Sequence, residues 1–359
     1  MTTKLKNYFP LIRERQDVLS EIQKKSTLNA TFRSWTSEQR EEFLNLCTGV
    51  RGIKLLYDGF FKEIMNPEYV PERLNDFLSH MLRQEVRILK VLPGDSTRIA
   101  DESSLLIMDI VVELEDRSIA NVEMQKVGYL FPGQRSACYS ADLLLRQYKR
   151  IRGETNDDFS YRDIKNVFTI VLFEKSPKNF HAYPHAHYHF FEQKSDTGLE
   201  MELLQKYLFI PLDIFRKSQH NKDINNKADA WLSLFSSDDP DTVIALSTAY
   251  PDFHKIYEEA YTICQNIERV MEMFSEELAI LDRNTVKYMM DEMQSTIDRQ
   301  THELQQKQAT IDEMHEKYTA ISIKNTISIL RSLKLSDQEI IQKLCEQYQM
   351  NEAQIQQYL

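Results

Sequence analysis

Two short apolar segments that carry carboxylates constrain the fold of this chain most strongly. The first spans residues 105–112 and contains Asp109, and after a polar turn a second one ends in Glu123-Met-Gln125. Alternate side chains of a β-strand share a face, so Glu123 and Gln125 point to one side while Met124 points into the core. We therefore expect a β-hairpin that brings Asp109, Glu123 and Gln125 to one edge.

A metal site would explain why carboxylates occur in these segments. Acidic residues at hairpin ends are usually solvated, and Glu113, Glu115 and Asp116 fit that description. Asp109, however, is followed by three apolar residues, and a buried carboxylate is costly unless it is paired or metal-bound. Oxygen ligands of this kind suit Mg²⁺, with Mn²⁺ as its substitute. Such a metal can activate a water for phosphodiester cleavage.

An Asp on one strand and Glu-x-Gln on the next resemble the PD-(D/E)XK nuclease superfamily, with Gln125 in place of the usual Lys. The chain looks most like recombination-promoting nucleases, or PD-(D/E)XK nuclease family transposases. Between about residues 55 and 215, three further segments resemble that family: the D-x-x-F-K opening at 58–62, Arg135-x3-Tyr139, and the strand with its aromatic lead-in at 161–173.

The resemblance implies roles for the residues at the hairpin edge. Asp109 and Glu123 would be metal ligands, together with the backbone carbonyl of Met124. Gln125 would stand where the superfamily Lys orients the attacking water, but it offers a dipole instead of a positive charge. Modest turnover is therefore expected, with the metal supplying most of the charge stabilisation.

Two neighbouring questions stay open at this level. The superfamily often adds an acidic residue from the first core helix, and Glu72, Asp76 and Glu85 are all available. Lys126 follows the motif directly but should point to the opposite face of the strand, so it is not expected to replace the missing Lys.

The order of predicted elements gives the fold class. Helices over 53–83, strands at 86–92, 104–114 and 118–125, a helix at 134–150 and a strand at 167–173 form the restriction-endonuclease-like αβββαβ core, an α/β fold with a mixed sheet. Strands near 187–191 and 200–210 extend this sheet. We divide the chain into a helical N-terminal extension (1–52), the nuclease-like core (53–215), a helical region (216–285), a coiled coil (286–322) and a C-terminal helical tail (323–359).

A surface for DNA would have to be local, because the formal net charge is −11. The predicted helix after the active strand carries Arg135, Arg146 and Lys149, which are candidates for the phosphate backbone. An ordinary solvated helix face explains the later cations of this helix equally well. Arg135 is the better candidate because it is nearest to the active strand in the chain.

A weak coiled coil is predicted between Met290 and Ile321. Apolar residues recur there every seven positions, whereas Gln300 and Lys307 occupy two of the intervening core positions. A homodimer is the natural interpretation, and a single solvated helix is the alternative. In the tail, Ser336 and Asn351 are predicted to cap two short helices. The last of these has no Lys or Arg, which favours protein contact over DNA readout.

Other features favour or exclude further classes. His185, His187 and His189 alternate and would share a face of a strand, where they could bind zinc, although a solvated polar face is the default. Four widely spaced cysteines without a CxxC pair argue against a zinc ribbon or disulfide framework. No apolar run approaches a membrane span and the start lacks a signal-peptide core, which predicts a cytoplasmic protein without membrane contact.

The sequence thus favours a Mg²⁺-dependent DNA endonuclease of the recombination-promoting type. The alternative is a catalytically weak or inactive nuclease fold, assembled by the coiled coil, that binds nucleic acid or protein. No second acidic cluster of the kind used by RNase H-like transposases is evident, so strand transfer does not follow from the residues.

Overall fold

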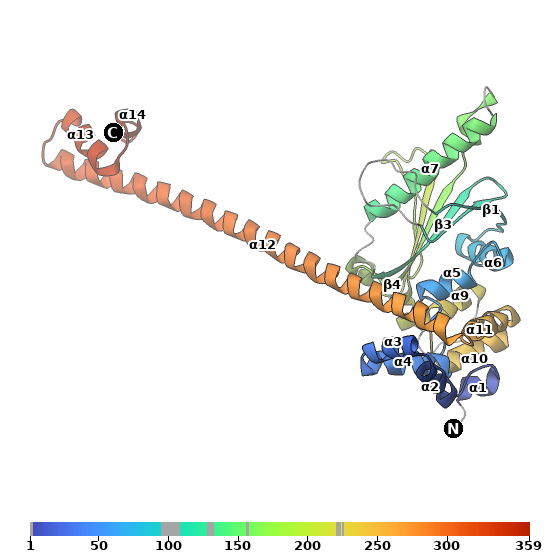
Figure 1. Cartoon of the computed structure of the whole chain (residues 1–359). Coiled ribbons are helices and arrows are strands. Elements are labelled where there is room, and N and C mark those ends of the chain that lie inside the picture. Colours follow the sequence, from blue (N-terminus) through green and yellow to red (C-terminus); the bar gives the residue numbers. More distant parts are fainter. Residues whose placement is uncertain (1–2, 95–107, 128–132, 156–157, 220–223, 225) are drawn as a thin grey trace. The chain divides into compact units, whose positions relative to one another are not determined.

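The computed structural model describes residues 3–94, 108–127, 133–155, 158–219, 224 and 226–359 (Figure 1). It divides into two compact units, residues 1–284 and 285–359. The sheet of the first unit has, over its described residues, the strand order β1-β2-β3-β4-β6-β5. Its strands are β1 (Ile88–Leu92), β2 (Ile110–Leu114), β3 (Ile119–Val127), β4 (Val167–Lys175), β5 (His189–Phe191) and β6 (Gln205–Pro211).

The sheet is mixed, as predicted. Strands β1, β2 and β3 form an antiparallel meander, β3 pairs in parallel with β4 and β4 with β6, and β5 closes the edge antiparallel to β6. Helix α6 (Pro71–Leu82) precedes β1, and α7 (Gly133–Thr155) is the crossover between β3 and β4. The order α6-β1-β2-β3-α7-β4 confirms the predicted αβββαβ core.

The two faces of the sheet contact different layers, because side chains alternate along each strand. On β3, Ala120, Val122 and Met124 belong to the larger hydrophobic core, which the other helices of this unit share. Ile119 belongs to a smaller core on the opposite face, where Tyr139 and Leu143 of α7 pack. The α7-covered face is also the face of Glu123, so α7 forms one wall of the site.

The larger core joins the ends of the first unit. Before α6 the chain forms α1 (Lys4–Tyr8), α2 (Arg15–Lys24), α3 (Ser26–Ser34), α4 (Ser37–Cys47) and α5 (Asp58–Ile64); after β6 it forms α8 (Leu212–Gln219), α9 (Lys227–Ser236), α10 (Pro240–Ala249), α11 (Pro251–Ile263) and the start of α12 (Ile267–Ser332). The Phe9 ring lies 5.2 Å from that of Tyr261, and the Trp35 ring lies 5.0 Å from that of Phe274. Residues 1–52, the nuclease-like core and residues 216–277 therefore share one core, and the predicted boundaries between them stay predictions.

The second strand differs from its prediction. The apolar pattern predicts a strand over 104–114, whereas β2 begins at Ile110 and residues 104–107 lie outside the described part of the chain. Asp109 directly precedes β2. The reason is a side-chain contact. The Asp109 carboxylate accepts the Met124 N–H, so this side chain replaces the next backbone hydrogen bond between β2 and β3.

The second unit contains most of the long helix α12, followed by α13 (Asp337–Tyr348) and α14 (Glu352–Gln356). Capping boxes at Ser336 and Asn351 start the last two helices, which confirms both predicted caps. These helices pack on the end of α12 through a small core that includes Ile327, Leu344 and Ile355. Among the described helices, none combines the length and apolar character needed to cross a membrane.

Candidate active site

Asp109 and Glu123 meet where β2 begins beside β3. The register pairs Ile110 with Val122. Asp109, which precedes Ile110, therefore lies opposite Glu123, which follows Val122. The Asp109 N–H donates to Oε1 of Glu123 at 3.3 Å, and the Met124 N–H donates to Oδ2 of Asp109 at 2.8 Å. Each carboxylate thereby holds the backbone of the opposite strand. The predicted pairing of these two residues is present in the structure.

The Glu123 carboxylate is buried, and the largely buried Asp109 carboxylate lies beside it. Glu123 is 1% exposed, and the Asp109 side chain is 16% exposed. Burial raises the pKa of Asp109 above its usual range, and the Met124 N–H and Lys62 only partly offset this rise. Burial and the neighbouring charge of Asp109 raise the pKa of Glu123 well above its usual range. Two adjacent carboxylates of this kind form a donor set for a hard cation.

Helix α5 brings a lysine to the pair, and sequence reasoning did not assign this residue to the site. Lys62 Nζ lies 3.9 Å from Oδ1 of Asp109 and 3.0 Å from Oδ2 of Asp58. Burial opposes the charge of Lys62. The hydrogen bond that Lys62 donates to Asp58 and the charges of Asp58, Asp109 and Glu123 outweigh this effect and raise the pKa of Lys62. The signal was present in the D-x-x-F-K segment, where Asp58 and Lys62 are spaced to share a helix face.

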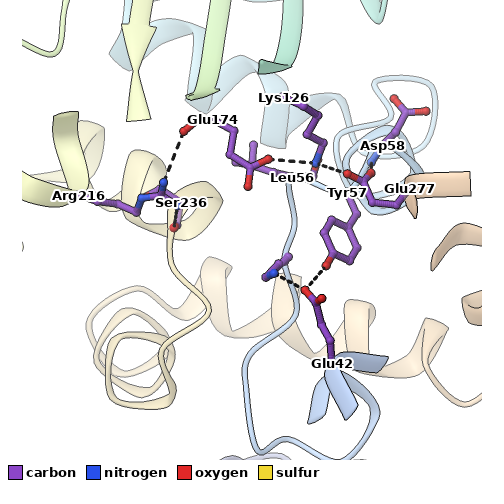
Figure 2. Close-up of polar contacts among 10 residues, drawn as sticks. Glu42, Leu56, Tyr57, Asp58, Lys126, Glu174, Arg216, Ser236 and Glu277 are labelled. Atoms are coloured by element: carbon purple, nitrogen blue, oxygen red, sulfur yellow. Dashed lines mark hydrogen bonds and ion pairs between the residues drawn. The ribbon is translucent and has the colours of Figure 1, made fainter. Parts of the chain in front are cut away.

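Gln125 and Lys126 lie on opposite faces of β3. Gln125 shares the face of Glu123 and is partly exposed. Lys126 is buried, donates to the Leu56 carbonyl, and lies 3.0 Å from Oε1 of Glu277 and 3.5 Å from Oε2 of Glu174 (Figure 2). The structure therefore confirms the prediction that Lys126 points to the opposite face of the strand from Glu123.

Helix α7 contributes Arg135 and Tyr139. The Arg135 guanidinium donates to the Tyr139 hydroxyl from Nε at 2.9 Å and from Nη2 at 2.6 Å. Its charge helps to lower the pKa of both site carboxylates, against the effect of burial. Burial and the charge of Glu123 raise the pKa of Tyr139. Of the cations predicted on this helix, Arg135 is the one whose charge acts on the site.

The later cations of α7 have other contacts. Arg146 lies 2.6 Å from Oδ2 of the buried Asp142, and it donates to the Pro93 carbonyl at 3.0 Å. Arg150 lies 2.9 Å from Oε1 of Glu113. Lys149 is exposed. Arg146 thus serves a packing role in the structure, and phosphate binding by Arg135, Arg146 and Lys149 stays a prediction.

The prediction that Glu113 is a surface charge is wrong. Its side chain is fully buried, and three cations surround it: Lys90 at 3.1 Å, Arg117 at 3.1 Å and Arg150 at 2.9 Å. The sequence gives no local sign of this, because two of the three cations come from β1 and α7.

The candidates for an additional acidic ligand do not join the pair. Asp76 accepts the indole N–H of Trp231 at 2.7 Å and lies 3.6 Å from His80, while Glu72 and Glu85 are exposed. Across the described residues, no cluster of three or more His, Cys, Asp or Glu side chains is arranged for a metal. The charge of another acidic side chain, Asp58 of α5, helps to raise the pKa of Asp109.

The three alternating histidines do not form a common strand face. His185 lies in a turn, and β5 begins only at His189. His187 lies 3.7 Å from Oδ1 of Asp229, and the His189 ring packs at 4.9 Å from that of Phe180. Within the described part of the chain, these histidines do not belong to a cluster that could hold a metal. The default of a solvated polar face is also wrong for His187, whose side chain is only 18% exposed.

The mixed sheet, the αβββαβ order and the Asp and Glu-x-Gln at one strand edge define a restriction-endonuclease-like fold. A model of the PD-(D/E)XK nuclease family transposase family matches residues 55–290, which is more than half of the chain, and the protein belongs to that family. No curated protein and no solved structure was found to match the chain.

Proposed function

We propose that the protein is a Mg²⁺-dependent endonuclease that hydrolyses phosphodiester bonds of DNA. The observation that carries this proposal is the adjacent burial of Asp109 and Glu123, each with a raised pKa. Burying two like charges next to each other is unfavourable unless a cation joins them. Family membership supports a nuclease as the reason for this arrangement.

The donor set fits a hard divalent cation such as Mg²⁺ or Mn²⁺. Asp109, Glu123 and the Met124 carbonyl would hold it through oxygen atoms, and water and phosphate oxygens would fill its other positions. The bound metal would supply Lewis-acid stabilisation and a water of lowered pKa.

The chain's own residues then prepare the reaction. The hydrogen bond from the Met124 N–H fixes the Asp109 carboxylate against β3. Gln125 on the same face can orient the attacking water through its side-chain amide. On α7, Arg135 adds positive charge beside the carboxylates, and the exposed Lys149 offers a further contact for the DNA backbone.

Cleavage assays test this proposal. The purified full-length protein is incubated with supercoiled plasmid and with single-stranded DNA and RNA, in Mg²⁺, Mn²⁺, Ca²⁺ or EDTA. We expect Mg²⁺- or Mn²⁺-dependent nicking that disappears with Glu123→Ala and persists with Glu85→Ala, since Glu85 is exposed and pairs with Arg87. Absence of cleavage on every substrate by folded wild-type protein would refute the proposal and favour a binding function.

We further propose a homodimer through α12. Apolar side chains at heptad positions of this helix are 49–67% exposed. These residues are Met293, Ile297, Leu304, Ile311, Met314, Tyr318 and Ile321. A row of this length is the surface that a second α12 would cover. Sedimentation of Leu304→Asp/Ile311→Asp should give a monomer where the wild type gives a dimer, and a monomeric wild type would contradict the proposal.

A further inference from the structure

The site lacks the positive charge that the superfamily lysine would supply at position 125. During hydrolysis the oxygen of a water forms a bond to phosphorus while the bond from phosphorus to the leaving sugar oxygen breaks. The attacking water loses a proton to the solvent, and the leaving oxygen takes one up from the solvent. Negative charge increases on the non-bridging phosphate oxygens meanwhile, and a nearby ammonium stabilises it. Gln125 stands at the usual Lys position and offers only a dipole.

Lys62 lies close enough to supply this positive charge, although it belongs to α5 and not to β3. Its Nζ is 3.9 Å from Oδ1 of Asp109, and Asp58 holds the ammonium from the preceding helical turn at 3.0 Å. The Lys62 side chain is 46% exposed, so the ammonium faces both the carboxylate pair and the solvent from which a phosphate would arrive.

Helix α5 is fixed firmly enough to position this ammonium. Phe60, Phe61 and Ile64 on the same helix are buried in the larger core. The Asp58 N–H at the start of the helix donates to Oε2 of the buried Glu277 at 3.2 Å, a contact visible in Figure 2.

The other cations near β3 are less suited to this role. Lys126 is 7% exposed and is bound by the Leu56 carbonyl and Glu277 on the opposite face of the sheet. Arg135 donates two hydrogen bonds to Tyr139. Lys62 combines proximity to Asp109 with access to solvent.

We propose that Lys62 is a catalytic residue that contacts the scissile phosphate and replaces the lysine absent from position 125. Its ammonium donates a hydrogen bond to a non-bridging oxygen and keeps its proton throughout. Asp58 acts as a positioning residue for it. This inference rests on the proposed nuclease function.

Single-turnover cleavage of saturating plasmid DNA in Mg²⁺ tests it. Lys62→Met should lower the rate constant on the order of 10²-fold or more. Lys62→Arg should retain part of the rate, since it keeps the charge. Lys25→Met is the matched control, because Lys25 is similarly exposed and ion-paired, with Glu268, and it should cleave like the wild type. Calorimetric Mg²⁺ affinity should be unchanged or higher in Lys62→Met, because a nearby positive charge has been removed.

A double variant separates catalysis from folding. Lys62→Met/Gln125→Lys moves the ammonium to the superfamily position. Its rate constant should be at least tenfold higher than that of Lys62→Met. If Lys62 had only a structural role, a lysine at position 125 would not raise the rate. Lys62→Met cleavage within threefold of wild type, while Glu123→Ala is inactive, would overturn the Lys62 assignment alone. Weakened Mg²⁺ binding with no rescue would overturn it as well. Wild-type protein that never cleaves would refute the nuclease proposal and this one together.

Discussion

Glu113 on β2 and Glu123 on β3 lie under the same helix and are buried to the same degree, yet their surroundings differ. Glu113 lies within 3.1 Å of three cations, supplied by β1, by the β2–β3 turn and by α7. Glu123 lies against a second carboxylate, and burial and that charge raise its pKa. A buried structural charge is balanced by the protein itself. This difference supports the proposal that Asp109 and Glu123 together bind a cation from solution.

Loss of activity should separate the two glutamates most strongly. Glu123→Gln removes a proposed metal ligand and should lower cleavage on the order of 10³-fold or more. In plasmid nicking with Mg²⁺, the remaining activity of Glu113→Gln should reflect only the fraction of folded protein. Equal specific activities of the two folded variants would break the comparison.

Stability should change in the opposite sense. Glu113→Gln leaves three cations without their buried partner and should lower the free energy of unfolding by about 3 kcal/mol. Glu123→Gln in EDTA removes an unfavourable charge and should not destabilise the protein. Urea denaturation followed by circular dichroism measures both. A loss below about 1 kcal/mol for Glu113→Gln would show that the cations are satisfied by water instead.

The buried Lys126–Glu277 pair on the opposite face of β3 should have a stability effect between those of Glu113 and Glu123. Lys126→Met removes the cation beside Glu277 and should cost about 2 kcal/mol, less than a fully broken pair, because Glu277 can take up a proton. Burial already raises the pKa of Glu277. Lys126→Met/Glu277→Gln should recover most of this loss, because Gln removes the unpaired charge and can still accept the Asp58 N–H. A double variant less stable than the single one would show that the unpaired Glu277 charge is not the cause of the loss.

The pH dependence of stability should sharpen the contrast further. In metal-free protein the raised pKa values of Asp109 and Glu123 mean that the folded state keeps protons that the unfolded state has released. Stability therefore falls as pH rises from the ordinary carboxyl pKa of about 4.3 through the raised values. Denaturation in EDTA across this range should show a shallower fall for Glu123→Gln than for wild type. Parallel curves would contradict the raised pKa of Glu123.

The smallest effect is expected for the later cations of α7 that are predicted to contact DNA. Lys149→Ala should weaken DNA binding evenly across sequences and reduce the slope of log affinity against log salt by about 1. Arg146→Ala should mainly reduce stability, because Arg146 is bound by Asp142 and the Pro93 carbonyl. Fluorescence anisotropy in Ca²⁺ at several salt concentrations distinguishes the two. An unchanged slope for Lys149→Ala would remove this residue from the interface.

Much of the fold followed from local pattern. Apolar segments predicted the strands that became β2 and β3, the family resemblance predicted β4, and the spacing at Ser336 and Asn351 predicted two helix starts. Asp109 and Glu123 were predicted together because the hairpin register depends only on neighbouring residues. Met108 and Asp109 were predicted within this strand but precede β2, because an apolar pattern does not show that the Asp109 carboxylate will accept the Met124 N–H.

What the sequence determined by itself was the type and order of the elements and the pair of carboxylates at one strand edge. The surroundings of these residues depend on long-range packing: Lys62 lies beside Asp109, three cations surround Glu113, and Trp231 donates to Asp76. The physical reason is the distance along the chain over which each effect acts. Periodicity and capping act over a few residues, whereas the partner of a buried charge comes from whichever distant segment the packing brings within hydrogen-bond distance.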